Sequence, residues 1–315
     1  MRTVTCPLCG GAIDYRSSIQ AYLGYKLYPC AGCDVQFWWP LVLDRRFYEE
    51  GSAYERSHLG VGKLEAYHRT FARFFPPRRE KLLDIGCGDG AFLEEMTRRN
   101  WDAYGIDLDR RSVDVAKQTR NLKNVWGMSL GEFVEMARKS NLRFRVITFF
   151  EVLEHQDRPR EFIAEIRTLL EPGGYIAGSV PNRDRMIRVR ESFDYPPNHF
   201  TWWSKRTVQA LLERNAFVEV VVREETCLKD AIWFLENQTL GAFDETLKRF
   251  VKGRILGADE RSAQAPIHCL AKGAAGKAEL ATVLVAVRNA LFLLPAVVLY
   301  PWLKAHIYFQ GRIPA

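Results

Sequence analysis

The sequence lacks the features that direct a protein across or into a membrane. It begins MRTVTCPLCGG, with charge and cysteines where a secretory signal needs an apolar run. A membrane span needs about 20 apolar residues without charge, and no stretch of this sequence meets that requirement. These absences predict a cytoplasmic protein.

The nearest approach to a span is residues 279–303, a dense apolar segment that Arg288, Asn289 and two prolines interrupt. After Asn289 it is free of polar groups for only about 14 residues, too few to cross a bilayer. We expect it either to dock as a peripheral contact on the inner face of the cytoplasmic membrane or to form a buried helix, on the core or between two copies. A true span is the weakest of the three interpretations.

Acidic residues are outnumbered, 38 against 45 lysines and arginines, which gives a net charge of +7. This favours an anionic partner, such as a phosphate of a sugar nucleotide, a nucleic acid or an acidic membrane surface. The basic run RDRMIRVR, residues 183–190, is suited to the phosphate of a glycan carrier or to a solvated charged face. The first 40 residues hold few basic side chains, which argues against a nucleic-acid partner.

The most informative motif lacks the G-x-G-x-x-G spacing of a dinucleotide site. Residues 82–93 read LLDIGCGDGAFL, an apolar strand, a glycine turn and a helix start. This turn is shaped for a group smaller than a pyrophosphate, such as a carboxylate, and Asp84 suits an ammonium. A second strand ends at Asp107, which is placed to accept hydrogen bonds from ribose hydroxyls. An amino acid joined to an adenosine meets both demands.

These two motifs together resemble the S-adenosylmethionine site of class I methyltransferases. The resemblance implies a methyltransferase that uses this cofactor, and one departure concerns the adenine. Many relatives place an aspartate after the third strand, whereas this chain has Met128 against the ring and Ser129 or backbone to hold it. The cofactor-binding residues that it implies are Asp84, Gly86, Cys87, Gly88, Gly90, Asp107, Leu108, Met128, Ser129 and Glu151.

A third motif, EVLEH, ends the strand predicted over residues 144–150 and delivers Glu151, Glu154 and His155 to the cofactor edge of the sheet. It resembles the motif of quinone-biosynthesis O-methyltransferases and of many sugar methyltransferases, over about residues 80–220. We predict that His155 is the general base, because its ordinary pKa lies near working pH. Alternatively, the three residues bind a divalent cation that lowers the pKa of the acceptor hydroxyl, or Glu154 caps a turn while His155 packs on the cofactor.

The stretch DYPPNHFTWWS, residues 194–204, is similar to a segment that covers the acceptor pocket in related methyltransferases. His199 is therefore a candidate second base or substrate contact. The aromatic residues around it would form a wall for a sugar or ring, or would only fill space in a rigid loop. These residues are Tyr195, Phe200, Trp202 and Trp203.

Four of the seven cysteines form two C-x-x-C pairs, Cys6 with Cys9 and Cys30 with Cys33. In a reducing compartment this spacing predicts a zinc ribbon, in which four thiolates close a structural site. The metal would supply much of the folding free energy of so small a module. A disulfide or a redox dithiol is the alternative.

From residue 81 onward, strands and helices alternate, which predicts an α/β fold with a doubly wound, mostly parallel, seven-stranded Rossmann-like sheet. We expect four regions: a zinc ribbon over 1–40, a linker and lid helix over 41–77, the S-adenosylmethionine-binding core over 78–225 and a helical C-terminal region over 226–315. The seventh strand is either PIHCLAKG or the terminal HIYFQGRIPA. In the lid helix, residues 63–75, Tyr67 would touch ligand or pack on the sheet.

The sequence thus predicts an S-adenosylmethionine-dependent methyltransferase. Its expected substrate is a sugar or small hydroxylated acceptor, with a lipid-linked or nucleotide-linked glycan among the candidates. A C-methyltransferase for a nucleotide deoxysugar is a rival, because such enzymes resemble this chain in joining a four-cysteine module to the core. An RNA methyltransferase and a non-catalytic scaffold that binds the cofactor are two further alternatives.

Overall fold

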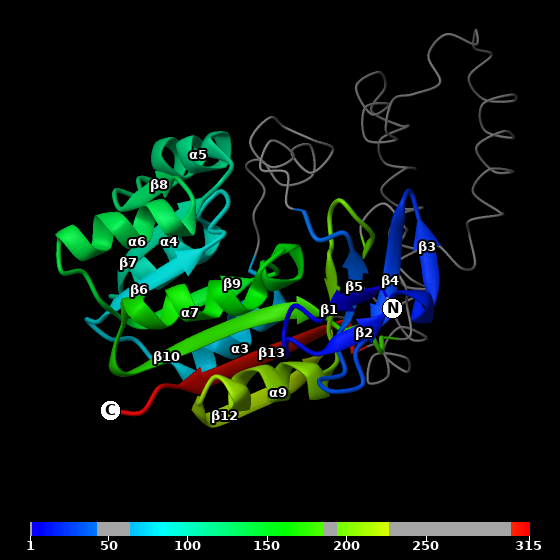
Figure 1. Cartoon of the computed structure of the whole chain (residues 1–315). Helices are drawn as coiled ribbons and strands as arrows, with labels where there is room; N and C mark the ends of the chain where they lie inside the picture. Colours follow the sequence, from blue (N-terminus) through cyan, green and yellow to red (C-terminus); the bar gives the residue numbers. More distant parts are fainter. Residues whose placement is uncertain (1, 43–63, 186–193, 227–303) are drawn as a thin grey trace, which may run out of the picture. The chain divides into compact units, whose positions relative to one another are not determined.

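The computed structural model describes residues 2–42, 64–185, 194–226 and 304–315 (Figure 1). All of its described strands and helices belong to one compact unit, formed by residues 1–225 and 305–315. The apolar segment 279–303, most of the connector after residue 42 and the second half of the basic run lie outside the described residues. No helix in the described ranges is long and apolar enough to cross a membrane.

A seven-stranded sheet forms the centre of this unit, and it confirms the predicted α/β fold. Its order is β12-β13-β10-β9-β6-β7-β8, with the five strands from β10 to β8 mutually parallel. The bounds are Lys81–Ile85 for β6, Asp102–Asp107 for β7, Val125–Gly127 for β8, Phe144–Phe150 for β9, Leu170–Pro181 for β10, Val218–Glu225 for β12 and His306–Arg312 for β13. The carboxyl ends of the parallel strands therefore share one edge, where such folds bind ligands.

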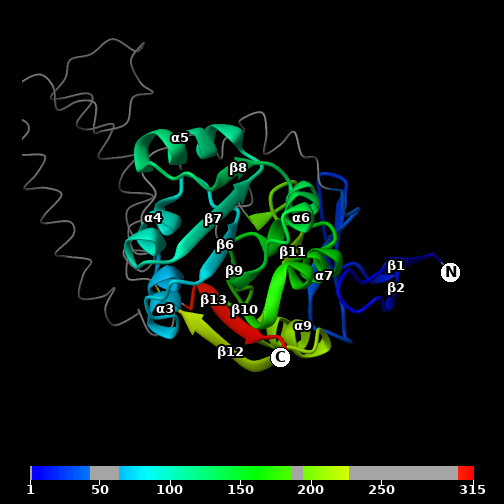
Figure 2. The ribbon, with the colours of Figure 1, turned by 90° about the vertical axis from the view of Figure 1, so that its left-hand side faces the viewer.

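Helices cover both faces of the sheet, as its near-continuous apolar strands require. Side chains of α3, α4 and α5 pack in one buried cluster, and those of α6, α7 and α9 in another. Figure 2 shows α3 and α4 on one side of the strands and α6, α7 and α9 on the other. The bounds are Ala66–Phe74 for α3, Ala91–Arg98 for α4, Arg110–Arg120 for α5, Leu130–Lys139 for α6, Pro159–Leu169 for α7 and Lys205–Arg214 for α9.

The terminal stretch supplies the seventh strand of the described sheet, and the other candidate, PIHCLAKG, lies outside the described residues. Strand β13 runs antiparallel to both β10 and β12 and lies between them. Ile307, Tyr308 and Phe309 are fully buried, because each face of an inserted strand meets a helical layer. The expectation that residues 226–315 form one helical region is therefore wrong for its last part, which belongs to the core sheet.

The N-terminal residues form two small antiparallel sheets. One pairs β1 (Thr3–Thr5) with β2 (Ala12–Asp14), and a short helix η1 (Tyr15–Ser17) follows it. The other has the order β11-β5-β4-β3, in which β3 (Gln20–Tyr22), β4 (Tyr25–Pro29) and β5 (Gln36–Trp39) come from the N-terminal module. Its fourth strand, β11 (Thr201–Trp202), comes from the α/β domain. Residues 1–40 therefore share a sheet with the α/β domain.

Candidate active site

In the glycine turn between β6 and α4, the space beside Gly86 is filled and the space beside Gly88 is open. Gly86 adopts a left-handed φ of 77°, and a Cβ there would come within 2.5 Å of the Val152 side chain. Gly88 also has a positive φ, 52°, but a Cβ there would meet nothing within 4 Å. Only glycine suits the first position, and the open space at Gly88 is a cradle that a ligand could fill.

Asp107 holds this turn through its carboxylate. Its Oδ2 accepts a hydrogen bond from the Gly88 amide at 2.8 Å, and its Oδ1 accepts one from the Asp109 amide at 2.8 Å. Burial raises the pKa of Asp107, and the two amides partly oppose that rise. The residue lies at the carboxyl end of β7, at the predicted position.

Asp84 is only 4 % exposed and lies on the neighbouring strand, β6. Its Oδ1 accepts a hydrogen bond from the Thr148 hydroxyl at 2.6 Å. Burial raises the pKa of Asp84 to about 7, with the negative charge of Asp107 adding to the rise and Thr148 opposing it. Within the described part of the chain, neither aspartate has a basic side chain within ion-pair distance. The pair therefore presents negative charge suited to a cationic, hydroxyl-bearing ligand.

The other predicted cofactor residues surround this turn but carry less chemistry. Cys87 is buried, and burial raises the pKa of its thiol well above the usual value, which makes it unreactive. Ser129 begins α6 as its N-cap and donates to the Glu132 carboxylate at 2.6 Å. Its role at an adenine, with Met128 and Leu108, stays a prediction.

A buried acid–base cluster lies at the end of β9, where the chain forms the short helix η2 (Leu153–His155). One ligand atom from each of Glu154, His155 and His199 lies within 4.8 Å of the others. Glu154 is 1 % exposed, and its two carboxylate oxygens have no hydrogen-bond donor among the described residues. Burial raises the pKa of Glu154 well above its ordinary value, and the nearby charge of Glu151 adds to this. An unsatisfied buried carboxylate points to a missing proton or cation.

His155 is held in a defined tautomer. Its Nδ1 lies 2.7 Å from the carbonyl oxygen of Asn198, and a carbonyl can only accept, so this nitrogen carries the hydrogen. The other nitrogen, Nε2, is then the basic one, and it lies 4.0 Å from Glu154 Oε1. Burial lowers the pKa of His155 to about 3, and nearby His199 lowers it further, so the ring is neutral at physiological pH.

His199 joins the cluster from the stretch 194–204, as predicted for a second base. Its ring centroid is 4.8 Å from that of His155, and its Nδ1 is 3.5 Å from Asp194 Oδ1. Burial opposes ionisation of Asp194, but His199 and Arg185 outweigh it and keep the pKa of Asp194 below its usual value. The two histidines thus come from segments more than 40 residues apart.

Glu151 does not join this cluster, contrary to the expectation for a helical EVLEH segment. Its φ is +54°, so the chain turns before η2 and directs the Glu151 side chain elsewhere. There it accepts a hydrogen bond from Ser179 at 2.7 Å and lies 3.2 Å from Nδ1 of His306. Sequence reasoning missed His306, although its place at the start of the antiparallel β13 brings it to the same edge.

The aromatic residues of 194–204 have two different roles. Phe200 and Trp203 are fully buried and fill space. Tyr195 and Trp202 are partly exposed, and their rings lie 5.1 Å and 5.6 Å from the ring of Trp38 in the N-terminal module. Of the four aromatic residues, only Tyr195 and Trp202 are exposed enough to contact an acceptor, and both pack on the fully buried Trp38. Their role as an aromatic wall stays a prediction.

The four N-terminal cysteines come together as predicted. Cys6 Sγ is 3.5 Å from Cys33 Sγ, and Cys9 Sγ is 3.5 Å from Cys30 Sγ, with no disulfide formed. All four sulfurs lie within 4.8 Å of one another. The hydrogen bond from Cys33 lowers the pKa of Cys6 to about 5, which favours a thiolate. Four convergent thiols of this kind fit a tetrahedral zinc ion.

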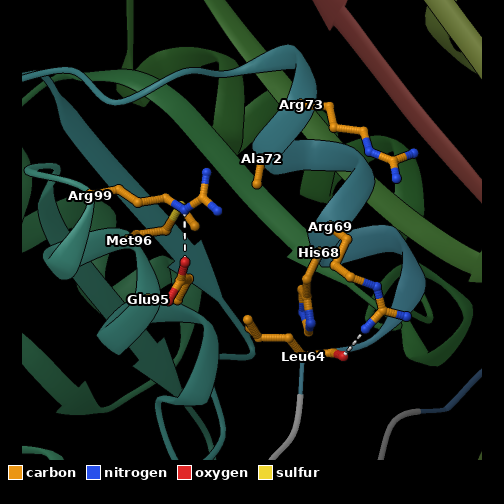
Figure 3. A pocket seen from close by; sticks show the side chains of 8 residues that line it. All are labelled: Leu64, His68, Arg69, Ala72, Arg73, Glu95, Met96 and Arg99. Atoms are coloured by element: carbon orange, nitrogen blue, oxygen red, sulfur yellow. Dashed lines mark hydrogen bonds and ion pairs between the residues drawn. The ribbon is translucent and has the colours of Figure 1, made fainter.

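A pocket lies between α3 and α4 (Figure 3), and it contains none of the predicted site residues. Arg99 pairs there with Glu95 at 2.8 Å, and Arg69 donates to the Leu64 carbonyl at 2.7 Å. On helix α3, Tyr67 is buried and stacks on Phe150 with ring centroids 5.3 Å apart. Helix α3 therefore packs on the sheet, and its role as a lid over ligand stays a prediction.

Residues 54–221 match the family model described as "Methyltransferase domain", which is more than half of the chain. A ubiquinone biosynthesis O-methyltransferase from Acinetobacter baumannii is 32% identical over 107 residues, which are 33% of this chain and 45% of that protein. The mitochondrial enzyme of the same name from Schizosaccharomyces pombe is 32% identical over 112 residues, 35% of this chain and 41% of that protein. The chain thus spans less than half the length of these curated relatives.

Two solved structures are similar to this chain at lower identity. A SAM-dependent methyltransferase from Archaeoglobus fulgidus is 17% identical with a TM-score of 0.47, over 83% of this chain and 100% of that one. Phosphoethanolamine N-methyltransferase 2 of Haemonchus contortus is 16% identical with a TM-score of 0.46, over 79% of this chain and 52% of that one. The family match shows that the chain belongs to the methyltransferase-domain family. The sheet, the glycine turn and the strand-end aspartate described above give it the fold of class I, S-adenosylmethionine-dependent methyltransferases.

Proposed function

We propose that this protein is an S-adenosylmethionine-dependent O-methyltransferase that acts on a hydroxyl of a sugar or similar small acceptor. The observation that carries the proposal is the buried cluster of Glu154, His155 and His199 at the same sheet edge as Asp84 and Asp107. The relatives named as ubiquinone biosynthesis O-methyltransferases support oxygen as the methylated atom.

The residues of the glycine turn fit the cofactor. Asp107, whose carboxylate is fixed by two amides, would accept hydrogen bonds from the ribose hydroxyls. Asp84 would pair with the ammonium of the methionine part, and that pairing offsets the cost of its buried charge. Open space at Gly88 leaves room for the ligand to approach the backbone. When bound there, the cofactor supplies a methyl group on a positively charged sulfur.

The histidine cluster would receive the proton of the acceptor. As the acceptor oxygen bonds to the methyl carbon, the carbon–sulfur bond breaks and the hydroxyl proton must leave. Nε2 of His155 is the basic nitrogen of its tautomer and would take that proton, with Glu154 and His199 beside it. Alignment of the hydroxyl supplies much of the rate, so even a weak base suffices.

A divalent cation also fits this cluster. One carboxylate and two imidazoles converge within 4.8 Å, and the oxygens of Glu154 have no donor in the described residues. When bound, the cation would lower the pKa of the acceptor hydroxyl. We propose His199 as its third ligand, in place of the Glu151 that the sequence suggested.

The four N-terminal thiols would hold a structural zinc ion, because four protein ligands leave no position for a substrate.

The acceptor would lie against Tyr195 and Trp202. Two arginines of the basic run are already engaged, Arg183 with Asp34 and Arg185 with Asp194. These two arginines are therefore less available for a phosphate. We propose a lipid-linked or nucleotide-linked acceptor at the inner face of the cytoplasmic membrane on the sequence of segments outside the described residues.

Calorimetric binding of S-adenosylmethionine and of its demethylated product tests the cofactor. Asp107→Ala should abolish binding, whereas Asp102→Ala, at the exposed start of the same strand, should not. Absence of binding to the unaltered protein would overturn the proposal.

Labelled methyl transfer to a panel of nucleotide-linked sugars, lipid-linked sugars and simple catechols then tests the acceptor. A new methyl on oxygen, identified by its NMR chemical shift, is the expected product. A new methyl on carbon would instead support the deoxysugar C-methyltransferase, which the four-cysteine module favours, and would overturn the proposed O-methylation.

A further inference from the structure

One short segment of the α/β domain, residues 198–202, lies between the four-cysteine module and helix η2. The amide of Trp38 in β5 donates to the carbonyl of Phe200 at 2.9 Å. On its other side, the amide of Phe200 donates to the carbonyl of Glu154 at 2.9 Å. A single residue therefore bonds with its backbone to the N-terminal module and to the proposed catalytic helix.

The same segment also fixes His155. The carbonyl of Asn198, two residues before Phe200, accepts the hydrogen bond from Nδ1 of this histidine at 2.7 Å. Thr201, one residue after Phe200, pairs with Phe37 of the N-terminal sheet. Asn198 is only two residues before Phe200 and three before Thr201, so a displacement of β5 would act on the Asn198 carbonyl through this short stretch of main chain.

Asp34 ties the second cysteine pair to the far end of this segment. It follows Cys33 directly, has a left-handed φ of 65°, and its amide donates to the Cys30 carbonyl at 2.8 Å. Its carboxylate accepts hydrogen bonds from the hydroxyl of Ser204 and from Arg183 at 3.0 Å. Burial opposes ionisation of Asp34, but Ser204 and Arg183 keep the pKa of its carboxyl below its usual value.

Ser204 is the N-cap of α9, and its Oγ also accepts from the Thr207 amide at 3.1 Å. The contact with Asp34 therefore fixes the point where the segment 198–202 enters a helix. The segment is therefore held at one edge by β5 and at its end by Asp34, and its other edge bonds to Glu154 of η2.

We infer that the four-cysteine module is a positioning element for the catalytic histidine, with Asp34 as its positioning residue. Metal-bound thiolates hold Asp34 and β5, these hold residues 198–202, and that segment holds His155 in its Nδ1–H tautomer with Nε2 as the base. The inference rests on the proposed function for the meaning of His155, but the placement of the ring can be measured without an acceptor.

The test compares Asp34→Gly with Asp34→Asn in the full-length, zinc-loaded protein. Glycine keeps the left-handed backbone and removes only the carboxylate. Asparagine also tolerates that conformation and retains one oxygen that can accept from Ser204. The matched control is Asp14→Gly, because Asp14 lies in the same module and its carboxylate accepts only the local Arg16 amide, at 2.9 Å, in the described structure.

Two measurements report on the contacts that connect Asp34 with His155 through residues 198–202. NMR of protein with ¹⁵N-labelled histidine reports the Nδ1–H of His155, one of six histidines, and hydrogen exchange reports residues 153–155 and 198–202. In Asp34→Gly we expect the Nδ1–H signal to shift or broaden and exchange in both segments to accelerate at least tenfold. Asp34→Asn should restore most of the protection, and Asp14→Gly should leave both readouts unchanged. Removal of zinc by a chelator should reproduce the Asp34→Gly result.

An unchanged His155 signal and unchanged exchange in Asp34→Gly and after chelation would overturn the inference. Equal acceleration throughout residues 81–107 would also overturn it, because the module would then be only a general stabiliser. Should Asp34→Gly fail to fold, Ser204→Ala breaks the same contact from the other side and carries the same expectation. Failure of the cofactor-binding experiment would leave these readouts intact, so the two hypotheses fail separately.

Discussion

Replacement of Asp84 by asparagine should make the free protein more stable while it removes a cofactor contact. Asp84 is buried, and burial raises its folded-state pKa to about 7, well above the ordinary value of 3.8 for an aspartate. The folded protein therefore binds this proton more tightly than the unfolded chain does. Its free energy of unfolding then falls as pH rises from about 4 to about 7 and is constant above that range. Asparagine lacks this titration and can still accept from Thr148.

The size of the effect follows from the same linkage. Each pH unit between the unfolded and folded pKa values changes the free energy of unfolding by about 1.4 kcal/mol. The full interval corresponds to roughly 4 kcal/mol, and the part between pH 5 and pH 7 to roughly 3 kcal/mol. The stability difference between Asp84→Asn and the unaltered protein should therefore grow by about 3 kcal/mol from pH 5 to pH 8.

Urea unfolding followed by tryptophan fluorescence at pH 5, 6, 7 and 8 measures this difference. Comparison of the two proteins at each pH cancels the titration of groups that do not interact with Asp84. Calorimetry should show at the same time that Asp84→Asn binds S-adenosylmethionine at least tenfold more weakly at pH 7. A stability difference that does not change with pH would refute the assignment of a raised pKa to Asp84. Unweakened binding would refute its pairing with the ammonium.

Three further changes test the metal, the base and the core. Metal analysis should find about one zinc per chain. Cys30→Ser should lower the zinc content and destabilise the protein by several kcal/mol. A stable protein without zinc would contradict the assignment of the four cysteines to a zinc ribbon. With an identified acceptor, His155→Ala should lower kcat by about 10²–10⁴-fold with unchanged cofactor affinity, and unchanged turnover would remove this residue from the mechanism. In urea unfolding, Phe150→Ala should cost about 3–5 kcal/mol, and Phe74→Ala, at a partly exposed position, should cost much less.

The strands of the sheet could be read from the sequence because their signal is local. The strand predicted to end at Asp107 is β7, and the range predicted as 144–150 coincides with β9; the apolar residues of both strands face helices on both sides. The seventh strand could not be assigned in the same way. Strand β13 pairs with residues 170–181 and 218–225 after a long intervening stretch, so only the tertiary fold selects it over PIHCLAKG.

The same difference between local and long-range signals applies to the candidate site. Asp84 and Asp107 were located correctly because each depends on one strand and the turn that follows it. The alternative that grouped Glu151 with Glu154 and His155 depended on a continuous helix, which the spacing of i, i+3 and i+4 requires. A positive φ at Glu151 and a helix of only three residues break that spacing, and residues far apart in sequence, His199 and His306, take the available places.

The N-terminal module was predicted as a separate ribbon, but its burial is incompatible with independence. About 40 residues cannot bury enough apolar surface for stability without a metal or a partner surface. Here Phe37 and Trp38 are fully buried in a sheet that β11 completes, and Val35 packs in the same cluster as α7 and α9. Because β11 is part of the segment 198–202 that holds His155, the surface that stabilises the module is also the surface that shapes the site. Loss of metal from the cysteines and loss of order around the histidine should therefore be linked events.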